Sequence, residues 1–469
     1  MNKVGRKSNL TLKQSVLAVV VVTASIIYFV WRVFFTLPFR YGSLSLVFGI
    51  LLLVCEGLGI LEMVTNIVNR QYKLPEMPQI PEKMFPHVDV LIATHNEDAD
   101  LLYKTINGCK YMKYPDKSKV HIYLCDDNDR PEINRLAKDM GVGYFGLSGN
   151  TEAKAGNLNN ALGKTSSELV VTFDADMIPT SDFLLETVPY FALPKMKKEN
   201  GRWVEKTPEE IEPGFKIGFV QIPQRFYNAD LFQYNLYSEK SIPNEQDFFF
   251  REVNVGRTKT NSVIYAGSNT VICREALESV GGIVTGTITE DLATGIKIQE
   301  KGYRSLAVDK ELAHGLSPEN FTSLVKQRQR WGRGGIQVMG RPSFWLNALP
   351  AAAKFSYFTS LIYWWTYFRR FVYVITPLLF AFFGIVFLDA TLQQLLFIWV
   401  PFMVLSYLGI EAISGRLRSP RLTSVFDTIL FPYMVLPILA ETLGVKMKKF
   451  AVTPKEKKVN FRNTEPRHT

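Results

Sequence analysis

Two long apolar runs open the chain and predict a transmembrane hairpin over residues 1–70. The runs cover about residues 14–36 and 43–68, and a short polar turn separates them. Each run is long enough to cross a bilayer and longer than the apolar core of a signal peptide, so we expect both to stay in the mature protein. Glu56 and Glu62 are unusual in such a run, and the sequence assigns them no function.

A different pattern follows a Pro-rich linker at residues 71–87. Short β-branched runs alternate with helical periodicity between residues 88 and 315. This alternation predicts an α/β domain with a mainly parallel, doubly wound sheet, whose ligand site lies at the carboxyl ends of the strands. The predicted strands cover residues 88–93, 120–125, 169–173 and 217–221, and the predicted helices lie near 101–108, 131–140 and 181–190.

Apolar, aromatic-rich sequence returns in the last third of the chain. Residues 316–370 are expected to form interfacial helices, because their aromatic segment is short enough to lie along a membrane surface. Residues 371–414 are expected to form a second transmembrane hairpin. Its two arms, 371–388 and 395–413, are each long enough to cross once.

A further apolar stretch covers residues 422–445. Pro432 and Pro437 are expected to break it, and basic residues flank both of its ends. A span here would place one basic cluster outside, so we expect residues 415–449 to be interfacial or re-entrant. This leaves four spans, with the α/β domain and both termini in the cytoplasm.

Composition favours a membrane protein over one that binds nucleic acid. The 469 residues are 47% hydrophobic and 13% aromatic, with a formal net charge of +10. Much of the excess lies near the two ends, as in cytoplasmic flanks at the cell (plasma) membrane, and no basic stripe interleaved with aromatic residues occurs between them. We therefore expect a lipid bilayer, and no nucleic acid, among its partners. The four cysteines and five histidines are scattered, so no disulfide framework or zinc site is indicated, and His95 is interpreted as a polar loop residue.

Four acidic clusters follow strand-like runs. Alone, such a cluster is more often a solvated loop or a helix N-cap, the role also expected of Thr289, but several at strand ends favour a binding site. Carboxylates spaced like Asp174 and Asp176 can hold Mg²⁺ or Mn²⁺, which share hard oxygen ligands with substrate phosphates. Asp291, at the start of a predicted helix over 291–300, is well placed as a general base for an attacking hydroxyl. The clusters are Thr94-His95-Asn96-Glu97, Asp126-Asp127, Asp174-Ala175-Asp176 and Thr289-Glu290-Asp291.

A polar and aromatic motif, Gln327-Arg328-Gln329-Arg330-Trp331, follows the α/β region. Helical spacing places Gln327, Arg330 and Trp331 on one face. Arg330 can make paired bonds to a diphosphate, and the Trp331 indole can stack on a sugar ring. An Arg–Trp pair near a membrane is as often an interfacial anchor. Together with the acidic clusters, the motif indicates transfer of a sugar from a nucleotide donor to a hydroxyl.

The order of these motifs resembles processive family-2 glycosyltransferases, most closely bacterial cellulose synthase catalytic subunits. The similarity continues through Gly315-Leu316-Ser317-Pro318-Glu319 and Phe450-Ala451-Val452-Thr453, so it covers nearly the whole chain. It implies a GT-A-like sheet inserted between transmembrane and interfacial helices, with a gating-loop-like tail at 450–469. The motifs that carry the resemblance are Asp126-Asp127, Lys154-Ala155-Gly156-Asn157-Leu158-Asn159, Asp174-x-Asp176, Thr289-Glu290-Asp291 and Gln327-x-x-Arg330-Trp331.

The resemblance also implies a function. It predicts an inverting glycosyltransferase that uses a UDP-sugar, with UDP-glucose favoured, to elongate a β-glucan and export it. It assigns catalysis to Asp291 with Glu290, and contact with the growing polysaccharide acceptor to Trp331. Asp174 and Asp176 would hold Mg²⁺ or Mn²⁺, and accessory subunits or a second copy of the chain are compatible partners. The implied nucleotide contacts are Thr94, Glu97, Asp126, Asp127, Lys154, Asp174, Gln327, Arg330 and Thr453.

Other interpretations stay open. Another β-linked polymer, hyaluronan-like or poly-N-acetylglucosamine, would use the same fold, and a single-sugar transferase to a lipid carrier would need no site for a growing chain. A catalytically inactive membrane scaffold or transporter subunit would gain nothing from four acidic clusters at one sheet edge. The stretch Ile264-Tyr265-Ala266-Gly267-Ser268 stands where cellulose synthases tend to have Phe-Phe-Cys-Gly-Ser, which leaves the product linkage open.

Overall fold

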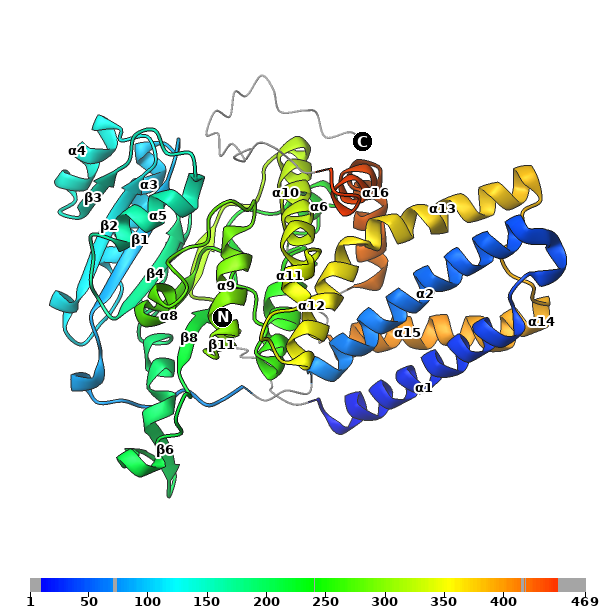
Figure 1. The fold of residues 1–469 in the computed structure, drawn as a ribbon, viewed down its shortest axis with the longest axis horizontal. Helices are drawn as coiled ribbons and strands as arrows, with labels where there is room; N and C mark the ends of the chain where they lie inside the picture. Colours follow the sequence, from blue (N-terminus) through cyan, green and yellow to red (C-terminus); the bar gives the residue numbers. More distant parts are fainter. Residues whose placement is uncertain (1–9, 71–73, 240, 415–416, 418, 446–469) are drawn as a thin grey trace. The chain divides into compact units, whose positions relative to one another are not determined.

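The computed structural model describes residues 10–70, 74–239, 241–414, 417 and 419–445 (Figure 1). The chain divides into two compact units. The first unit combines the N-terminal helices with the described residues that follow Phe355, and the second is built from Leu74–Lys354. We call them the membrane-type unit and the α/β unit. The predicted tail at 450–469, including Thr453, lies outside the described residues.

A seven-stranded sheet forms the centre of the α/β unit. Its strand order is β11-β8-β10-β4-β1-β2-β3, and every neighbouring pair is parallel except the two that involve β10. The prediction of a mainly parallel sheet is therefore confirmed, with one reversed strand. In sheet order the strands are β11 (Arg304–Ala307), β8 (Ile217–Gln221), β10 (Thr270–Cys273), β4 (Leu169–Asp174), β1 (Val88–Thr94), β2 (Val120–Asp126) and β3 (Gly143–Gly146).

Helices cover both faces of this sheet. Alternate residues of β1 point to opposite faces, so Val90 and Ile92 belong to one apolar cluster and Leu91 to the other. The first cluster is closed by α3 (Ala99–Lys110) and α4 (Pro131–Asp139), and the second by α5 (Ala153–Leu162), α8 (Arg274–Glu278) and α9 (Glu290–Glu300). These faces bury the alternating apolar residues and leave the strand ends to carry polar ones.

The smaller elements of the α/β unit surround the sheet. A three-stranded sheet has the order β5-β12-β9, and a hairpin joins β6 to β7. The strands are β5 (Ile178–Pro179), β6 (Met196–Glu199), β7 (Arg202–Glu205), β9 (Arg225–Phe226) and β12 (Ala313–Gly315). The remaining helices are α6 (Leu231–Asn235), α7 (Asn254–Gly256), α10 (Phe321–Met339), α11 (Pro342–Trp345) and α12 (Ala351–Trp364), the last of which continues into the membrane-type unit.

The helix expected at residues 181–190 is wrong. The chain there forms successive turns, followed by a 3-10 helix at Val188–Lys195. Pro189 and Pro194 lack the backbone N–H that an α-helix would use. Neighbouring amides bond to carbonyls either three residues back, as Tyr190 does to Thr187, or four, as Val188 does to Leu184, so no regular α-helical ladder forms. The apolar periodicity was genuine, because Phe183, Leu184 and Val188 are buried, but it belongs to a tighter coil.

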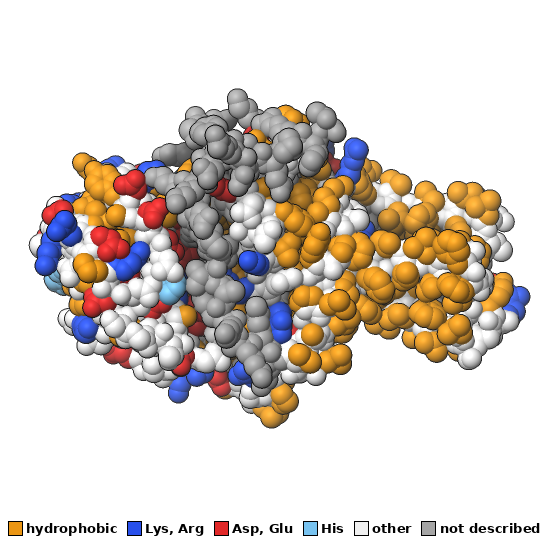
Figure 2. Space-filling view, turned by 90° about the horizontal axis from the view of Figure 1, so that it is seen from above, with side chains coloured by type: hydrophobic (Ala, Val, Ile, Leu, Met, Phe, Trp, Pro, Cys, Tyr) orange, Lys and Arg blue, Asp and Glu red, His pale blue; other side chains and the backbone are white. Residues whose placement is uncertain are grey.

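The membrane-type unit consists of long apolar helices. Four helical segments of the described chain are long and apolar enough to cross a membrane: Leu12–Arg70, Thr366–Phe383, Leu392–Ile413 and Pro420–Thr442. Their outward side chains are mostly hydrophobic, and Figure 2 shows them covering the exposed helix surfaces almost continuously. The helices are α1 (Leu12–Phe35), α2 (Gly42–Arg70), α13 (Thr366–Phe383), the short α14 (Leu392–Gln394), α15 (Val400–Ile413) and α16 (Pro420–Thr442).

The expected break at Pro432 and Pro437 is wrong. Helix α16 runs without interruption through both prolines, each of which removes only its own backbone N–H from the ladder. In Figure 1 this helix is seen largely end-on, whereas α1, α2, α13 and α15 extend across the page. Helix α16 therefore points in a different direction from these four helices and packs mainly against α13, although its length and composition would let it cross a bilayer.

Two buried ion pairs join the helices of this unit. Arg32 of α1 donates to Glu56 of α2 at 2.7 Å, and Arg369 of α13 donates to Glu62 of α2 at 2.6 Å. The two acidic residues that looked out of place in the second apolar run thus face basic partners on neighbouring helices. Tyr28 of α1 also stacks on Phe402 of α15, with 4.2 Å between ring centroids. Charge pairing therefore fixes how α1, α2 and α13 pack.

Replacing Glu56 with Ala should destabilise the protein by about 3–5 kcal/mol, because Arg32 would remain buried without its carboxylate partner. Thermal unfolding of the protein in detergent measures the loss. Glu76→Ala is the matched control, since Glu76 pairs with Lys198 at 2.9 Å on an exposed surface and should contribute no more than about 1 kcal/mol. Equal melting temperatures for the two variants would contradict a stabilising role for the buried pair.

Candidate active site

A cavity of about 720 Å³ opens at the carboxyl ends of β1 and β4. Its wall includes eleven of the thirteen site residues that the sequence predicts, which come from segments far apart in the chain. Only Asp126 and Thr453 are missing from that set, and Thr453 lies outside the described residues. The eleven are Thr94, Glu97, Asp127, Lys154, Asp174, Asp176, Glu290, Asp291, Gln327, Arg330 and Trp331.

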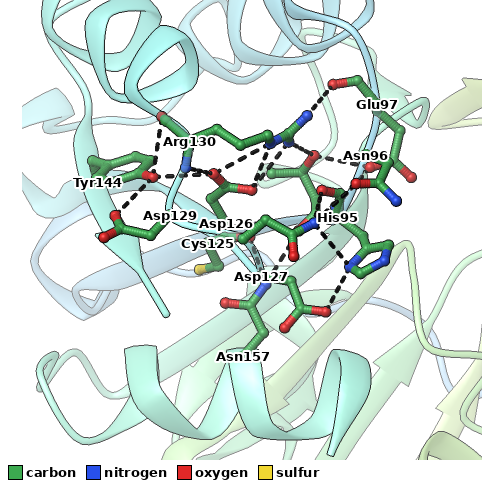
Figure 3. A network of polar contacts seen from close by, with 12 residues as sticks. His95, Asn96, Glu97, Cys125, Asp126, Asp127, Asp129, Arg130, Tyr144 and Asn157 are labelled. Atoms are coloured by element: carbon green, nitrogen blue, oxygen red, sulfur yellow. Dashed lines mark hydrogen bonds and ion pairs between the residues drawn. The ribbon is translucent and has the colours of Figure 1, made fainter. Parts of the chain in front are cut away.

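A hydrogen-bonded loop after β1 contributes to the wall of the cavity, and Figure 3 shows its polar contacts. The Glu97 carboxylate accepts bonds from the Thr94 hydroxyl at 2.9 Å and from the backbone N–H of His95 at 2.7 Å. Arg130, which precedes α4, donates to the same hydroxyl at 2.9 Å and to the Glu97 carbonyl at 2.8 Å. The loop is therefore held in one shape before any ligand arrives.

Asp126 holds that arginine and does not reach the cavity, which corrects its predicted contact with the nucleotide. Its side chain is fully buried. It accepts a bond from the backbone N–H of Arg130 at 2.6 Å, forms an ion pair with that guanidinium at 3.0 Å, and accepts from Tyr144 at 3.0 Å. Its role is thus to position Arg130, while the next residue along the chain faces the cavity.

Asp127 is oriented by two side chains that the sequence did not assign to the site. His95 donates from Nδ1 to one carboxylate oxygen at 2.8 Å, and Asn150 donates to the other (Figure 3 shows the histidine contact). The backbone N–H of Asp127 also bonds to the Thr94 carbonyl at 3.0 Å. His95, interpreted above as a polar loop residue, is therefore a positioning residue of the site.

Lys154 lies among the carboxylates of the cavity wall. Its ammonium donates to Asp174 at 2.5 Å and to the Gly267 carbonyl at 2.8 Å. Gly267 has a left-handed backbone with φ of +78°, and a Cβ there would lie 2.8 Å from an Asp291 carboxylate oxygen. The Ser268 hydroxyl accepts from the backbone N–H of Asp174 at 2.9 Å. The sequence marks residues 264–268 only as a difference from the Phe-Phe-Cys-Gly-Ser of cellulose synthases, and the structure brings this segment into the site.

The residues expected to hold a metal ion offer a small set of ligands. Asp176 is buried, and its carboxylate accepts from the backbone N–H of Leu316 at 3.0 Å, while Asp174 faces Lys154. Among the described residues, no three His, Cys, Asp or Glu side chains gather as a preformed metal site. Mg²⁺ and Mn²⁺ commonly take one or two carboxylates and complete their shell with substrate phosphates and water. The residues present fit an ion bound in that way.

The acidic pair Glu290 and Asp291, at the start of α9, also lines the cavity. Burial raises the pKa of Asp291, and burial together with the charge of Asp291 raises the pKa of Glu290 to about 7. Lys154 and Arg330 act in the opposite direction on both groups. The expected cap by Thr289 is wrong, because its side chain makes no capping bond and its buried hydroxyl has no hydrogen-bond partner in the described structure.

Helix α10 carries the aromatic and basic part of the wall. Gln327, Arg330 and Trp331 all line the cavity, so the predicted shared face is confirmed. The Arg328 guanidinium lies over the Trp331 ring, 4.5 Å from the ring centroid, and pairs with Glu245. The ring is therefore held by a cation–π contact and presents its remaining surface to the cavity.

Comparison with known proteins identifies the family. Residues 169–408 match the family described as "Glycosyl transferase family group 2", and residues 89–197 match "Glycosyl transferase family 2". The chain belongs to glycosyl transferase family group 2. Among solved structures, this family-group-2 chain is similar to the mannosyltransferase PcManGT from Pyrobaculum calidifontis in complex with GDP-Man and Mn²⁺, at 18% identity and a TM-score of 0.56. That similarity covers 85% of this chain and 99% of the mannosyltransferase and shows a shared GT-A-like fold.

Curated relatives of the family-group-2 chain include bacterial cellulose synthases. It is 30% identical over 447 residues to the cellulose synthase catalytic subunit [UDP-forming] of Pseudomonas fluorescens, covering 94% of this chain and 58% of that protein. It is 30% identical over 441 residues to cellulose synthase 2 of Novacetimonas hansenii, covering 92% and 26%. The chain thus spans between about a quarter and three-fifths of the length of these relatives.

Gly267→Ala should reduce sugar transfer by about 100-fold, because the added Cβ would displace the carboxylate of Asp291 from its place in the wall. Initial rates with purified protein measure the effect. Gly201→Ala is the control, since Gly201 has a similar backbone φ of +80° in open space and carries the same left-handed penalty without the clash. If both variants lose activity equally, backbone strain rather than crowding at Asp291 is the cause.

Glu290→Gln should stabilise the protein at pH 8 by about 3 kcal/mol, since a carboxyl whose folded-state pKa lies near 7 instead of 4.5 disfavours folding once it ionises. The destabilisation by ionised Glu290 is absent at low pH and grows as pH rises from 4.5 to 7. The difference in unfolding free energy between Glu290→Gln and wild type should therefore shrink to below about 1 kcal/mol at pH 5. Melting temperatures of both proteins across this range provide the test. A pH-independent difference would show that Glu290 does not titrate there.

Proposed function

We propose that this protein is a membrane-embedded, inverting glycosyltransferase that uses a UDP-sugar, with UDP-glucose favoured, to elongate a β-glucan of the cellulose type. The observation that carries the proposal is the convergence of the separate acidic motifs and of Gln327, Arg330 and Trp331 on one cavity wall. The names of the curated relatives, which include UDP-forming cellulose synthases, support the choice of donor and product.

The donor would bind along the sheet edge. Thr94, Glu97 and Asp127 face the cavity from the rigid loops after β1 and β2 and would hold the nucleoside. Lys154, Gln327 and Arg330 would reach the diphosphate, with Arg330 offering paired N–H donors. Asp174 and Asp176 would hold Mg²⁺ or Mn²⁺, which when bound neutralises charge on the departing diphosphate.

The acceptor would approach from the side of Trp331. Its ring, backed by Arg328, would stack on the terminal sugar of the growing chain. Asp291 would take the proton from the attacking hydroxyl, whose oxygen then bonds to the anomeric carbon as the bond to UDP breaks on the opposite side, so configuration inverts. The raised pKa of Asp291 makes its carboxylate a stronger base than an exposed aspartate.

The membrane-type unit would anchor the enzyme in the plasma membrane. Helices α1, α2, α13 and α15 would cross the bilayer, which keeps the α/β unit and both termini in the cytoplasm. The crosswise course of α16 in Figure 1 supports an interfacial position for that helix. Export of the polymer, a gating role for Thr453 in the 450–469 tail, and accessory subunits or homo-oligomers stay predictions.

A related polymer is the second candidate. Ala266 lines the cavity at a position where the cellulose synthases that this sequence resembles tend to have Cys. Its neighbour Gly267 lies so close to Asp291 that a Cβ there would be 2.8 Å from the carboxylate. A hyaluronan-like or poly-N-acetylglucosamine product would therefore differ from a glucan at this wall, while the donor half of the site would serve both.

The deciding experiment offers the full chain, in nanodiscs, a panel of UDP-sugars with Mg²⁺ or Mn²⁺. Incorporation of glucose from UDP-glucose into a polymer that a β-1,4-specific glucanase digests is the expected result. A polymer made only from UDP-N-acetylglucosamine would favour the second candidate, and transfer of a single sugar to lipid would contradict processive synthesis.

Asp291→Asn should lower polymer synthesis by at least about 1,000-fold while the Kd for UDP changes by less than about tenfold, because the lost group would act on the acceptor and not on the nucleotide. Radiolabelled incorporation and calorimetric UDP binding separate the two effects. Asp139→Asn, an exposed carboxylate at the end of α4, is the control and should keep full activity. Synthesis by Asp291→Asn at more than one tenth of the wild-type rate would show that another group acts as the base.

A further inference from the structure

The Lys154 ammonium occupies a central place among the acids of the cavity. It lies 2.5 Å from an oxygen of Asp174, which is one of the two residues assigned above to a metal ion. The second contact, 2.8 Å to the Gly267 carbonyl, holds it on the side of Asp291. A Cβ built on Gly267 would lie 3.3 Å from the ammonium and 2.8 Å from the Asp291 carboxylate, so both groups crowd the same small volume.

The surroundings of this lysine suit an ammonium. Its nitrogen donates to two acceptors, the Asp174 carboxylate and the Gly267 carbonyl, and Glu290 and Asp291 line the same cavity. Only 20% of the side chain is exposed. A positive charge thus stands at Asp174 before any donor or ion binds.

We propose that Lys154 acts as an internal cation that keeps divalent ions away from Asp174 until the diphosphate of the donor draws the lysine off. The inference rests on the proposed function, because it needs a nucleoside-diphosphate donor and a divalent ion in this cavity. It makes the two ligands bind as a unit: the ion binds weakly alone, and the diphosphate supplies both a new partner for Lys154 and oxygen ligands for the ion.

Elementary electrostatics supports this exchange. An ammonium and a divalent ion cannot share one carboxylate oxygen closely, because their repulsion in a partly buried site is larger than in water. No third acidic, cysteine or histidine ligand joins Asp174 and Asp176 within the described ranges, so an ion arriving alone has little to offset the loss of the Lys154–Asp174 pair. The flexible stem of lysine, at the first turn of α5, lets the charged end move without a backbone change.

The test measures Mn²⁺ binding to the full chain in nanodiscs, by electron paramagnetic resonance of free Mn²⁺, with and without saturating UDP. The wild-type protein should bind Mn²⁺ at least about tenfold more tightly with UDP present. Lys154→Met should bind Mn²⁺ alone at least about fivefold more tightly than wild type, and UDP should raise its Mn²⁺ affinity by a smaller factor than in wild type, because only the oxygen ligands of the diphosphate still contribute. Coupling between two ligands is reciprocal. In Lys154→Met, the factor by which Mn²⁺ tightens UDP binding should therefore fall, relative to wild type, as much as the factor by which UDP tightens Mn²⁺ binding.

Two further variants exclude simpler explanations. Lys104 also lines the cavity, from an exposed position on α3, so Lys104→Met removes one positive charge without touching Asp174 and should change Mn²⁺ affinity by less than about twofold. Lys154→Arg keeps the charge and should keep nucleotide-free Mn²⁺ binding weak. It also serves as the folded comparison if the methionine variant does not fold, because strong Mn²⁺ binding by the arginine variant would then overturn the proposal.

The outcomes are distinguishable. Unchanged or weaker nucleotide-free Mn²⁺ binding in Lys154→Met, or an equal gain in Lys104→Met, would overturn the internal-cation role while leaving the proposed transferase intact. Absence of UDP binding by the wild-type protein, with or without Mn²⁺, would instead overturn the proposed function on which the inference rests.

Discussion

A charge removed from water needs an opposite charge beside it, and this constraint shapes both units of the protein. In the core of the α/β unit, Arg274 pairs with Asp89 at 2.7 Å and also bonds to the loop that enters β4. That contact joins the beginnings of β1 and β4 to the start of α8. In the membrane-type unit, Arg32 and Arg369 each meet a glutamate of α2. The sheet and the helix pairs can take few other arrangements without leaving a buried charge alone.

The same constraint explains how the cavity keeps its shape. Asp126 forms an ion pair with Arg130, and this arginine in turn holds the loop that carries Thr94 and Glu97. Its neighbour Asp127 points the other way and is held by His95 and Asn150. Two adjacent carboxylates thus have different tasks because alternate positions at a strand end face opposite sides.

The sequence predicted the sheet and most of the cavity wall because both depend on local patterns. Four strands appear as apolar runs, and polar residues directly after such runs must gather at one edge of a parallel sheet. The partners of those residues were harder to see. His95 and Asn150 meet Asp127 only through the fold. His95 lies inside the cluster at residues 94–97, but nothing there shows that it contacts Asp127, and the residues around Asn150 carry no such cluster. The turns at 181–190 were misjudged because burial there has a helical period, while two prolines prevent the helix.

The reversed direction of β10 has a consequence for how this site can diversify. Because β10 is antiparallel to β4, with Thr270 opposite Thr172, it is the entrance to the strand, not its exit, that lies at the ligand edge. The chain therefore approaches Asp291 through residues 264–268, whose backbone is held by Asn254, Gln221 and Gln224. Because residues 264–268 precede β10, their side chains can change without removing a backbone hydrogen bond between β10 and its neighbouring strands. A single reversed strand thereby separates a part of the wall that can vary, which in the proposed enzyme would face the acceptor, from the parallel strand ends, which would face the donor.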